Sequence, residues 1–256
     1  MSSASSAPGA LLFARYAYPP NALGLCGADS PRTLLEYGQA GESDAGLAEL
    51  ARTFEGAWPY LTLIASANRI ADPLDRRVVE AYWVGNALLD QVEPGELARH
   101  VEDRFRGRLG RAREQVAQAV AAGAVPHHCF HVFAVYPWLG LLRSGIVDEP
   151  LRVLDRCRIT PARVRSVEGE IAVVAARPLL WDGRTLRLGE PAERRVRWQH
   201  DGLAFVPSLR PGDRVSLHWD AVCDVLSDGA ARSLDRATRR ALRAANGSTA
   251  AAAVAG

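Results

Sequence analysis

The stretch CRITPARVRSVEGEIAVV at residues 157–174 opens the part of the chain that decides the fold, and PGDRVSLHWDAVCDVL at residues 211–226 closes it. Between them, short runs rich in β-branched and aromatic residues alternate with Gly, Asp and Pro. Such runs, with turn residues roughly every eight to twelve positions, are typical of a small antiparallel barrel or sandwich. Cys157 near the start and His218 near the end are of residue types that bind transition metals.

The residues before this stretch carry helical patterns instead. Ser30-Pro31, Ser43-Asp44 and Asp72-Pro73 each place helix-starting residues before an apolar repeat of helical period. Residues 60–70 show the same period, and residues 94–122 predict one or two amphipathic helices. The chain is therefore expected to be all-helical up to about residue 123.

Two other segments complete the predicted order. Residues 13–27 contain Pro19-Pro20 and Gly24, which predict an irregular packed segment after a short helical turn. Residues 228–246 predict a last helix that stops at Gly247. The sequence thus predicts an α+β protein with five parts: a disordered N-terminus at 1–10, a helical domain at 11–150, a β-barrel module at 151–228, a C-terminal helix at 229–246 and a disordered tail at 247–256.

Composition excludes several classes of partner and compartment. The 256 residues are 48% hydrophobic and carry a formal charge of +2, with arginine but no lysine, and the arginines alternate with acidic residues. This balance argues against nucleic acid as a partner. The N-terminus lacks the basic region of a signal peptide, and no apolar run is long enough to cross a membrane. With four cysteines and no CxxC pair, we expect a cytoplasmic protein whose cysteines are reduced.

Two motifs in the β-rich stretch match those of a known family. Residues 157–164 fit C-x-x-x-P-x-[KR]-V, and residues 212–218 fit G-D-x-V-x-[LV]-H. In this order and at this spacing, residues 155–246 resemble the HypC/HupF-type chaperones of hydrogenase maturation, small OB-like barrels followed by a helix. Two features differ from that family: Cys157 is internal rather than next to the initiator Met, and Trp219 follows His218. The whole chain is also similar to an uncharacterised actinobacterial family with motifs such as YPPNALG and VLDRCRI.

The resemblance implies a function and a ligand set. HypC-type chaperones carry an iron–cyanide–carbonyl unit transiently toward the large subunit of nickel–iron hydrogenase. Cys157 and His218 would then be the two protein ligands of iron, and the partner would be a hydrogenase large-subunit precursor or a maturation scaffold protein. A thiolate and an imidazole suit such an ion and leave positions open for other ligands. In the structural alternative, Cys157 is a small buried hydrophobe and His218 an ordinary strand residue.

Two acidic residues near His218 are candidates for orienting its ring. Asp220, two residues further on, would point to the same side of a strand and could hold the imidazole. A solvated strand end explains it equally. Asp213 is the second candidate, although its place in a Gly-Asp turn suffices to account for it.

A second cluster of possible ligands lies in PHHCFH at residues 126–131. On a helix, His131 shares a face with His127 and with His128, while Cys129 points elsewhere. A zinc or iron site and simple packing are both compatible with this pattern, and no HExxH arrangement accompanies it.

Three functions follow from these observations. The first is a non-enzymatic accessory or chaperone protein for metal-centre assembly in nickel–iron hydrogenase maturation, which holds iron or docks a partner through Cys157 and His218. The second is an enzyme of unknown reaction with a cleft at the domain junction near the histidine cluster. The third is a metal-free protein-binding module.

Overall fold

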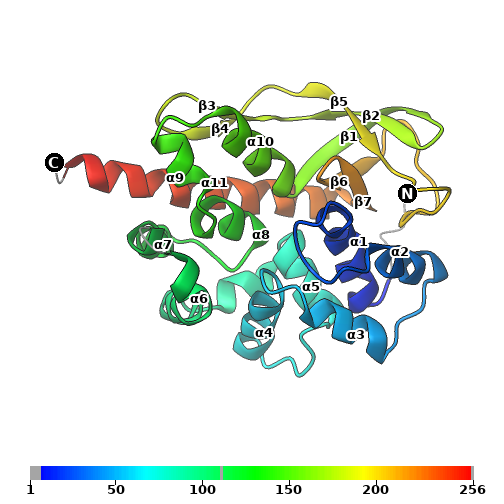
Figure 1. The fold of residues 1–256 in the computed structure, drawn as a ribbon, viewed down its shortest axis with the longest axis horizontal. Coiled ribbons are helices and arrows are strands. Elements are labelled where there is room, and N and C mark those ends of the chain that lie inside the picture. The colour runs from blue at the N-terminus through cyan, green and yellow to red at the C-terminus, as the bar shows by residue number, and fades with distance from the viewer. Residues whose placement is uncertain (1–6, 110–111, 255–256) are drawn as a thin grey trace.

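The structure is a computed structural model that describes residues 7–109 and 112–254, and it is a mixed α+β fold with a sheet of five strands (Figure 1). The α+β prediction is therefore confirmed. Eight helical segments precede residue 122: α1 (Gly9–Ala22), α2 (Pro31–Ala40), α3 (Ala45–Arg52), α4 (Trp58–Ala67), α5 (Arg76–Trp83), the 3₁₀ helix η1 (Ala87–Gln91), α6 (Pro94–Leu109) and α7 (Ala112–Ala121).

Helix α1 replaces the irregular segment that Pro19-Pro20 predicted. The two prolines lie inside the helix, and nearly all of its residues are buried. Because α1 is surrounded by other elements, its apolar residues follow no one-sided helical pattern, which is why the sequence pattern missed it. The helix also begins at Gly9, within the predicted disordered N-terminus; residues 1–6 lie outside the described residues.

Side-chain caps fix where two of the predicted helices begin. The Asp44 carboxylate accepts a hydrogen bond from the Leu47 N–H at 3.0 Å, so α3 begins at Ala45 as expected. The Asp75 carboxylate accepts from the Arg77 N–H at 2.8 Å, so α5 begins at Arg76 rather than directly after Asp72-Pro73.

Short helices connect the helical part to the strands. They are α8 (His128–Phe130), the π-helical η2 (His131–Val135), α9 (Trp138–Arg143) and α10 (Asp148–Cys157). Helix α10 runs through the predicted boundary at residue 150, and Cys157 is its last residue.

Five strands pair in a closed order. They are β1 (Thr160–Glu168), β2 (Ile171–Ala176), β5 (Ala192–Arg197), β7 (Ala221–Val225) and β6 (Arg214–His218), and β6 pairs again with β1. All the pairs are antiparallel except β5 with β7, which join through the single parallel pair Arg197↔Ala221. A separate hairpin consists of β3 (Leu179–Trp181) and β4 (Leu186–Leu188).

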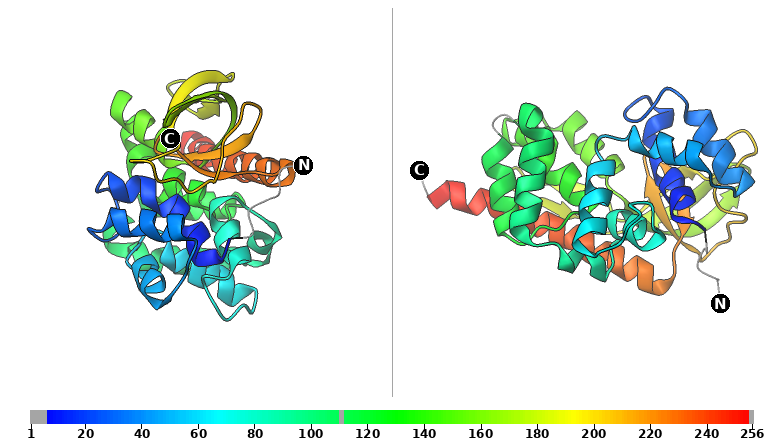
Figure 2. Two further views of the ribbon diagram at one scale, coloured as in Figure 1. Left: turned by 90° about the vertical axis from the view of Figure 1, so that its right-hand side faces the viewer. Right: turned by 90° about the horizontal axis from the view of Figure 1, so that it is seen from below.

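The last helix, α11 (Asp228–Val254), passes between the strands and the N-terminal helices (Figures 1 and 2). It contacts α7, α8, β1 and β6. It also continues past Gly247, where the sequence predicted a stop. Among the described residues, none of the helices combines the length and the apolar character that crossing a membrane requires.

One hydrophobic cluster joins the two halves. It contains α1 residues such as Phe13 together with Ile159 and Cys223 from the strand region. Polar contacts reinforce this junction, because the Tyr16 hydroxyl lies 2.9 Å from the Ser216 hydroxyl and Arg15 pairs with Asp224 at 2.6 Å. The described core therefore crosses the boundary that the sequence placed near residue 150.

Candidate metal centre

Pairing of β1 with β6 brings Cys157 and His218 to one end of the sheet. The two strands are antiparallel, with Thr160 opposite Leu217. In an antiparallel pair the start of one strand lies beside the end of the other, so the start of β1 lies beside the end of β6. Cys157 lies just before β1 and His218 is the last residue of β6, so these two residues, 61 positions apart in the sequence, lie close together in the fold.

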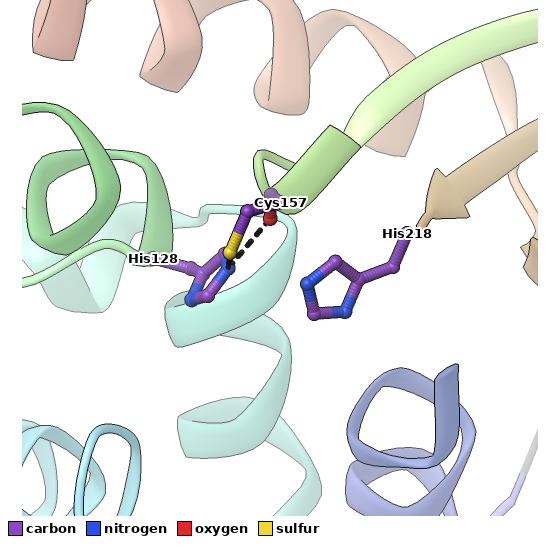
Figure 3. Close-up of side chains that lie close together, drawn as sticks. All are labelled: His128, Cys157 and His218. Atoms are coloured by element: carbon purple, nitrogen blue, oxygen red, sulfur yellow. Dashed lines mark hydrogen bonds between the residues drawn. The ribbon is translucent and has the colours of Figure 1, made fainter. Parts of the chain in front are cut away.

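His128 approaches the same point from the helical part of the chain (Figure 3). Each of His128, Cys157 and His218 offers a ligand atom, and these atoms all lie within 4.8 Å of one another. The Cys157 sulfur is 3.9 Å from Nε2 of His128. Ligand atoms of one tetrahedral ion lie roughly 3.5 Å apart, given bonds of about 2.0–2.3 Å. Small side-chain rotations would bring the three within bonding distance of a single ion.

The ring of His218 is held with one nitrogen available. Nδ1 lies 2.7 Å from the Tyr16 carbonyl oxygen, which can only accept, so Nδ1 carries the proton. Nε2 is buried and has no hydrogen-bond partner among the described residues. A histidine that donates from one nitrogen to a carbonyl and keeps the other unprotonated is the usual arrangement of a metal ligand.

The Tyr16 carbonyl can accept a hydrogen bond from His218 because Pro20 lies four residues later in α1. In an α-helix this oxygen would accept the N–H of the residue four positions later, and here that residue is Pro20, which has no N–H. The buried oxygen takes its partner from His218 instead. Pro20, one of the two prolines that misled the secondary-structure prediction, therefore supports the site.

His128 makes two hydrogen bonds in this structure. Nε2 lies 2.8 Å from the Cys157 carbonyl oxygen, and Nδ1 lies 3.1 Å from the Tyr82 hydroxyl. The Tyr82 hydroxyl is also 3.0 Å from the Gly56 carbonyl oxygen, to which it can donate. If Nε2 binds a metal, the proton moves to Nδ1, and the Tyr82 oxygen can accept it. The surroundings of His128 thus satisfy both tautomers.

Burial keeps the three side chains uncharged. It lowers the pKa of His128 to about 4, against a smaller opposite effect of the Cys157 carbonyl. Burial, and next the proximity of His128, lower the pKa of His218 well below its usual value, while the carbonyls of Tyr16 and Cys157 oppose this. Burial also raises the pKa of the Cys157 thiol. Neutral imidazoles are ready to bind a metal, and the thiol would release its proton on binding.

A cavity of about 560 Å³ opens beside the cluster, and all three side chains line it. His131 lines it too, with its Nδ1 3.1 Å from the Tyr60 hydroxyl. The other walls are mostly apolar and aromatic: Phe54, Tyr82, Trp83, Tyr136, Trp138 and Trp219. A small ligand or a partner's side chain could reach the cluster through this space. Part of the predicted alternative cluster therefore shares one cavity with Cys157 and His218.

The expected role of Asp220 needs correction. His218 pairs with Ala221, so Trp219 and Asp220 form a two-residue turn with φ of 49° and 59°. The alternation of a strand therefore does not extend to Asp220. Its carboxylate pairs with Arg156, at 3.1 Å, and with Arg194. The Tyr16 carbonyl orients His218 in its place.

Asp213 and the remaining members of the histidine cluster lie in structural positions. The Asp213 carboxylate accepts the Arg210 N–H at 2.8 Å within its turn. His127 caps α8, since its Nδ1 accepts the Cys129 N–H at 3.1 Å. The Cys129 sulfur lies 3.7 Å from the Thr238 hydroxyl of α11, in a fully buried position.

Several residues that build the site were given no role from the sequence. Tyr16, Pro20 and Tyr82 act through a carbonyl, a missing N–H and a hydroxyl, and none of these has a pattern of its own. Trp83 packs against both imidazoles, with ring centroids 4.7 Å from His128 and 5.8 Å from His218. The only available signal was that two prolines lie in an otherwise apolar segment.

The chain belongs to a protein family of unknown function, DUF6390, whose model matches residues 5–252. No curated protein matches the sequence, and no solved structure matches it either. The family match spans both the N-terminal helices and the strands, so the residues of the cluster all lie within the part that defines the family.

Proposed function

We propose that this protein binds a transition-metal ion through Cys157, His218 and His128, and that it acts as an accessory protein in metal-centre assembly. The observation that carries the proposal is the convergence of three ligand atoms within 4.8 Å beside a cavity. The buried Nε2 of His218, which has no hydrogen-bond partner among the described residues, adds support, since such an atom is costly unless something binds it.

The donor set favours a borderline or soft ion. One thiolate and two imidazoles suit Fe²⁺, Zn²⁺ or Co²⁺ and suit Mg²⁺ or Ca²⁺ poorly. Three protein ligands leave at least one position of a tetrahedral ion for another group. An ion held in this way can be passed on, because an incoming ligand has a place to bind before the protein lets go.

The HypC-type resemblance suggests iron as cargo and nickel–iron hydrogenase maturation as the context. Cys157 and His218 are the residues of the two family motifs, and the β1–β6 pairing gives a physical reason why those motifs act together. The partner would be a hydrogenase large-subunit precursor or a maturation scaffold protein. His128 comes from outside the resembling module and would be this chain's own addition.

Metal titration tests the binding site. Chelator-treated protein would be titrated anaerobically with Fe²⁺, and separately with Co²⁺, and bound metal measured by elemental analysis and absorption. We expect one ion per chain, with affinity lowered at least about tenfold in Cys157→Ser, His218→Ala and His128→Ala. His200→Ala is the matched control, because His200 lies away from the cluster against Tyr18. Absence of binding, or equal affinities in all variants, would refute the site.

A separate experiment tests the context. Iron-loaded protein would be mixed with a purified hydrogenase large-subunit precursor, and complex formation followed by size-exclusion chromatography. We expect a complex that is lost in Cys157→Ser. If metal binds but no complex forms, the metal site stands and the hydrogenase context fails.

The cavity favours a second function, a metal-dependent enzyme. Its volume of about 560 Å³ is that of a small-molecule site. In this case the same three residues would hold the ion, and the apolar walls would select the substrate. Turnover of a small molecule by the metal-loaded protein, abolished in His218→Ala, would favour this function over metal delivery.

A further inference from the structure

A fourth possible ligand lines the same cavity from the loop between α1 and α2. Cys26 is a free, partly buried cysteine, and it shares the cavity with His128, Cys157 and His218. The cavity thus brings together two thiols, of Cys26 and Cys157, and three imidazoles, of His128, His131 and His218. The His218 ring is 1% exposed, and its Nε2 has no hydrogen-bond partner among the described residues. This buried nitrogen is an independent reason to look for a ligand in the cavity.

The loop that carries Cys26 is held by a buried side chain. Asn21 is 5% exposed, and its amide nitrogen donates to the carbonyl oxygens of Cys26 and Ala28, both at 2.7 Å. Gly27 has a φ of 84°, and a Cβ there would come within 2.4–2.8 Å of the Phe54 ring, which also lines the cavity. These contacts set the position of Cys26 in the metal-free protein.

We propose that Cys26 is the fourth ligand of the metal and completes a tetrahedral Cys₂His₂ set. This inference rests on the proposed metal site and adds to it. The ligand atoms of His128, Cys157 and His218 already lie within 4.8 Å of one another, whereas Cys26 is outside that group. A shift of the 23–27 loop into the cavity would close the site.

The structural element that carries each ligand determines which ligand dissociates from the metal first. Cys157 and His218 are fixed by α10 and the β1–β6 pair, and His128 by α8, while Cys26 belongs to a loop. Cys26 is therefore the ligand that exchanges. The metal–sulfur bond to Cys26 breaks and its sulfur takes up a proton, while an incoming thiol loses a proton and forms the new metal–sulfur bond. No electron is transferred in this step.

Cobalt absorption tests the inference, because the thiolate-to-cobalt charge-transfer band grows with the number of thiolate ligands. The full chain would be loaded with Co²⁺ as wild type, Cys26→Ala, Cys157→Ala and Cys223→Ala. We expect the band to fall by about half in Cys26→Ala and also in Cys157→Ala. It should stay unchanged in Cys223→Ala, the matched control, since Cys223 is fully buried and does not line the cavity.

The outcomes separate this inference from the proposed function. A full band in Cys26→Ala, with half the band in Cys157→Ala, would overturn the fourth ligand and leave the metal site intact. No cobalt binding by the wild type would overturn both. Cys26→Ser provides a second variant of nearly the same size, and circular dichroism of the metal-free proteins shows whether each variant is folded. A folded Cys26→Ser that keeps the full band counts against the inference.

Discussion

A single missing N–H in α1 determines the state of the proposed metal ligand His218. Pro20 leaves the Tyr16 carbonyl without its helical partner, and His218 Nδ1 donates to that oxygen at 2.7 Å. The imidazole is thereby fixed in one tautomer with Nε2 available. Proline inside a helix costs about 3 kcal/mol, so its presence here suggests that the freed carbonyl has a use.

Replacing this proline should separate helix stability from metal binding. In Pro20→Ala, the new N–H can bond the Tyr16 carbonyl and compete with His218. We expect metal affinity to fall about tenfold, while the midpoint of thermal unfolding of the metal-free protein stays the same or rises. Isothermal titration with Co²⁺ and thermal denaturation measure the two effects. Pro19→Ala is the matched control, since its N–H would face the Arg15 carbonyl and leave affinity unchanged. Equal affinities in Pro20→Ala and wild type would contradict this role.

At the scale of elements, the site depends on three junctions: the end of α10, the end of β6 and the start of α8. Each ligand lies at an element terminus, where the backbone changes direction and a side chain can point into a space between elements. The resemblance to the two HypC-type motifs singled out Cys157 and His218 as a pair of candidate ligands. The sequence did not contain the register of β1 with β6, which sets their distance.

His128 shows why the third residue could not be chosen from sequence. Helical spacing favoured His131 together with His127 or His128, as neighbours on one face. In the structure, His127 caps α8, and the segment from His131 is a π-helix rather than a regular α-helix. Because of these departures from a regular helix, neighbouring histidine side chains point in different directions. Tertiary packing determines that His128 is the one that lies beside Cys157 and His218.

The contact between α11 and the β3–β4 hairpin provides a test at the same scale. The Asn246 amide pairs with the Leu186 backbone, accepting from its N–H at 3.0 Å and donating to its carbonyl at 2.9 Å. Asn246→Ala should cost about 1–3 kcal/mol of unfolding free energy, because two partly buried backbone groups lose their partner. Urea denaturation measures the change. Arg243→Ala, exposed on the same helix, should change stability by less than about 0.5 kcal/mol. Equal effects of the two substitutions would show that the Asn246 pair contributes nothing.

At the scale of the whole molecule, one hydrophobic cluster contains residues of both the helical part and the strand region, while the interior of the five strands forms a cluster of its own. Residues of α1 pack in the same cluster as Ile159 and Leu226, and α11 lies between the two halves (Figure 2). Sequence periodicity found most of the helices and the strand-rich stretch, since those patterns are local. It could not find that α1 is central, because a helix buried on all sides has no polar face to mark it. The predicted division into domains stays a prediction.

Buried neutral histidines at this junction make the stability of the metal-free protein depend on pH. Burial lowers the pKa of His127 to about 3 and of His128 to about 4, and lowers that of His218 as well. In the unfolded chain, a histidine has a pKa of about 6.5. Between pH 6.5 and about 4 the unfolded state therefore binds more protons than the folded state. Stability is complete above this window and is lost as the pH falls through it.

Well below pH 6.5, each such histidine contributes a loss of about 1.4 kcal/mol per pH unit. We therefore expect the unfolding free energy of the chelator-treated protein to fall by several kcal/mol between pH 7 and pH 5. Carboxylates with lowered pKa, such as Asp75 and Asp182, act only at lower pH, because their unfolded value is about 3.9. Urea denaturation at pH 7, 6 and 5 measures the slope. A flat profile across this range would mean that these imidazoles are not buried as neutral groups, and the metal site built on them would then lose its physical basis.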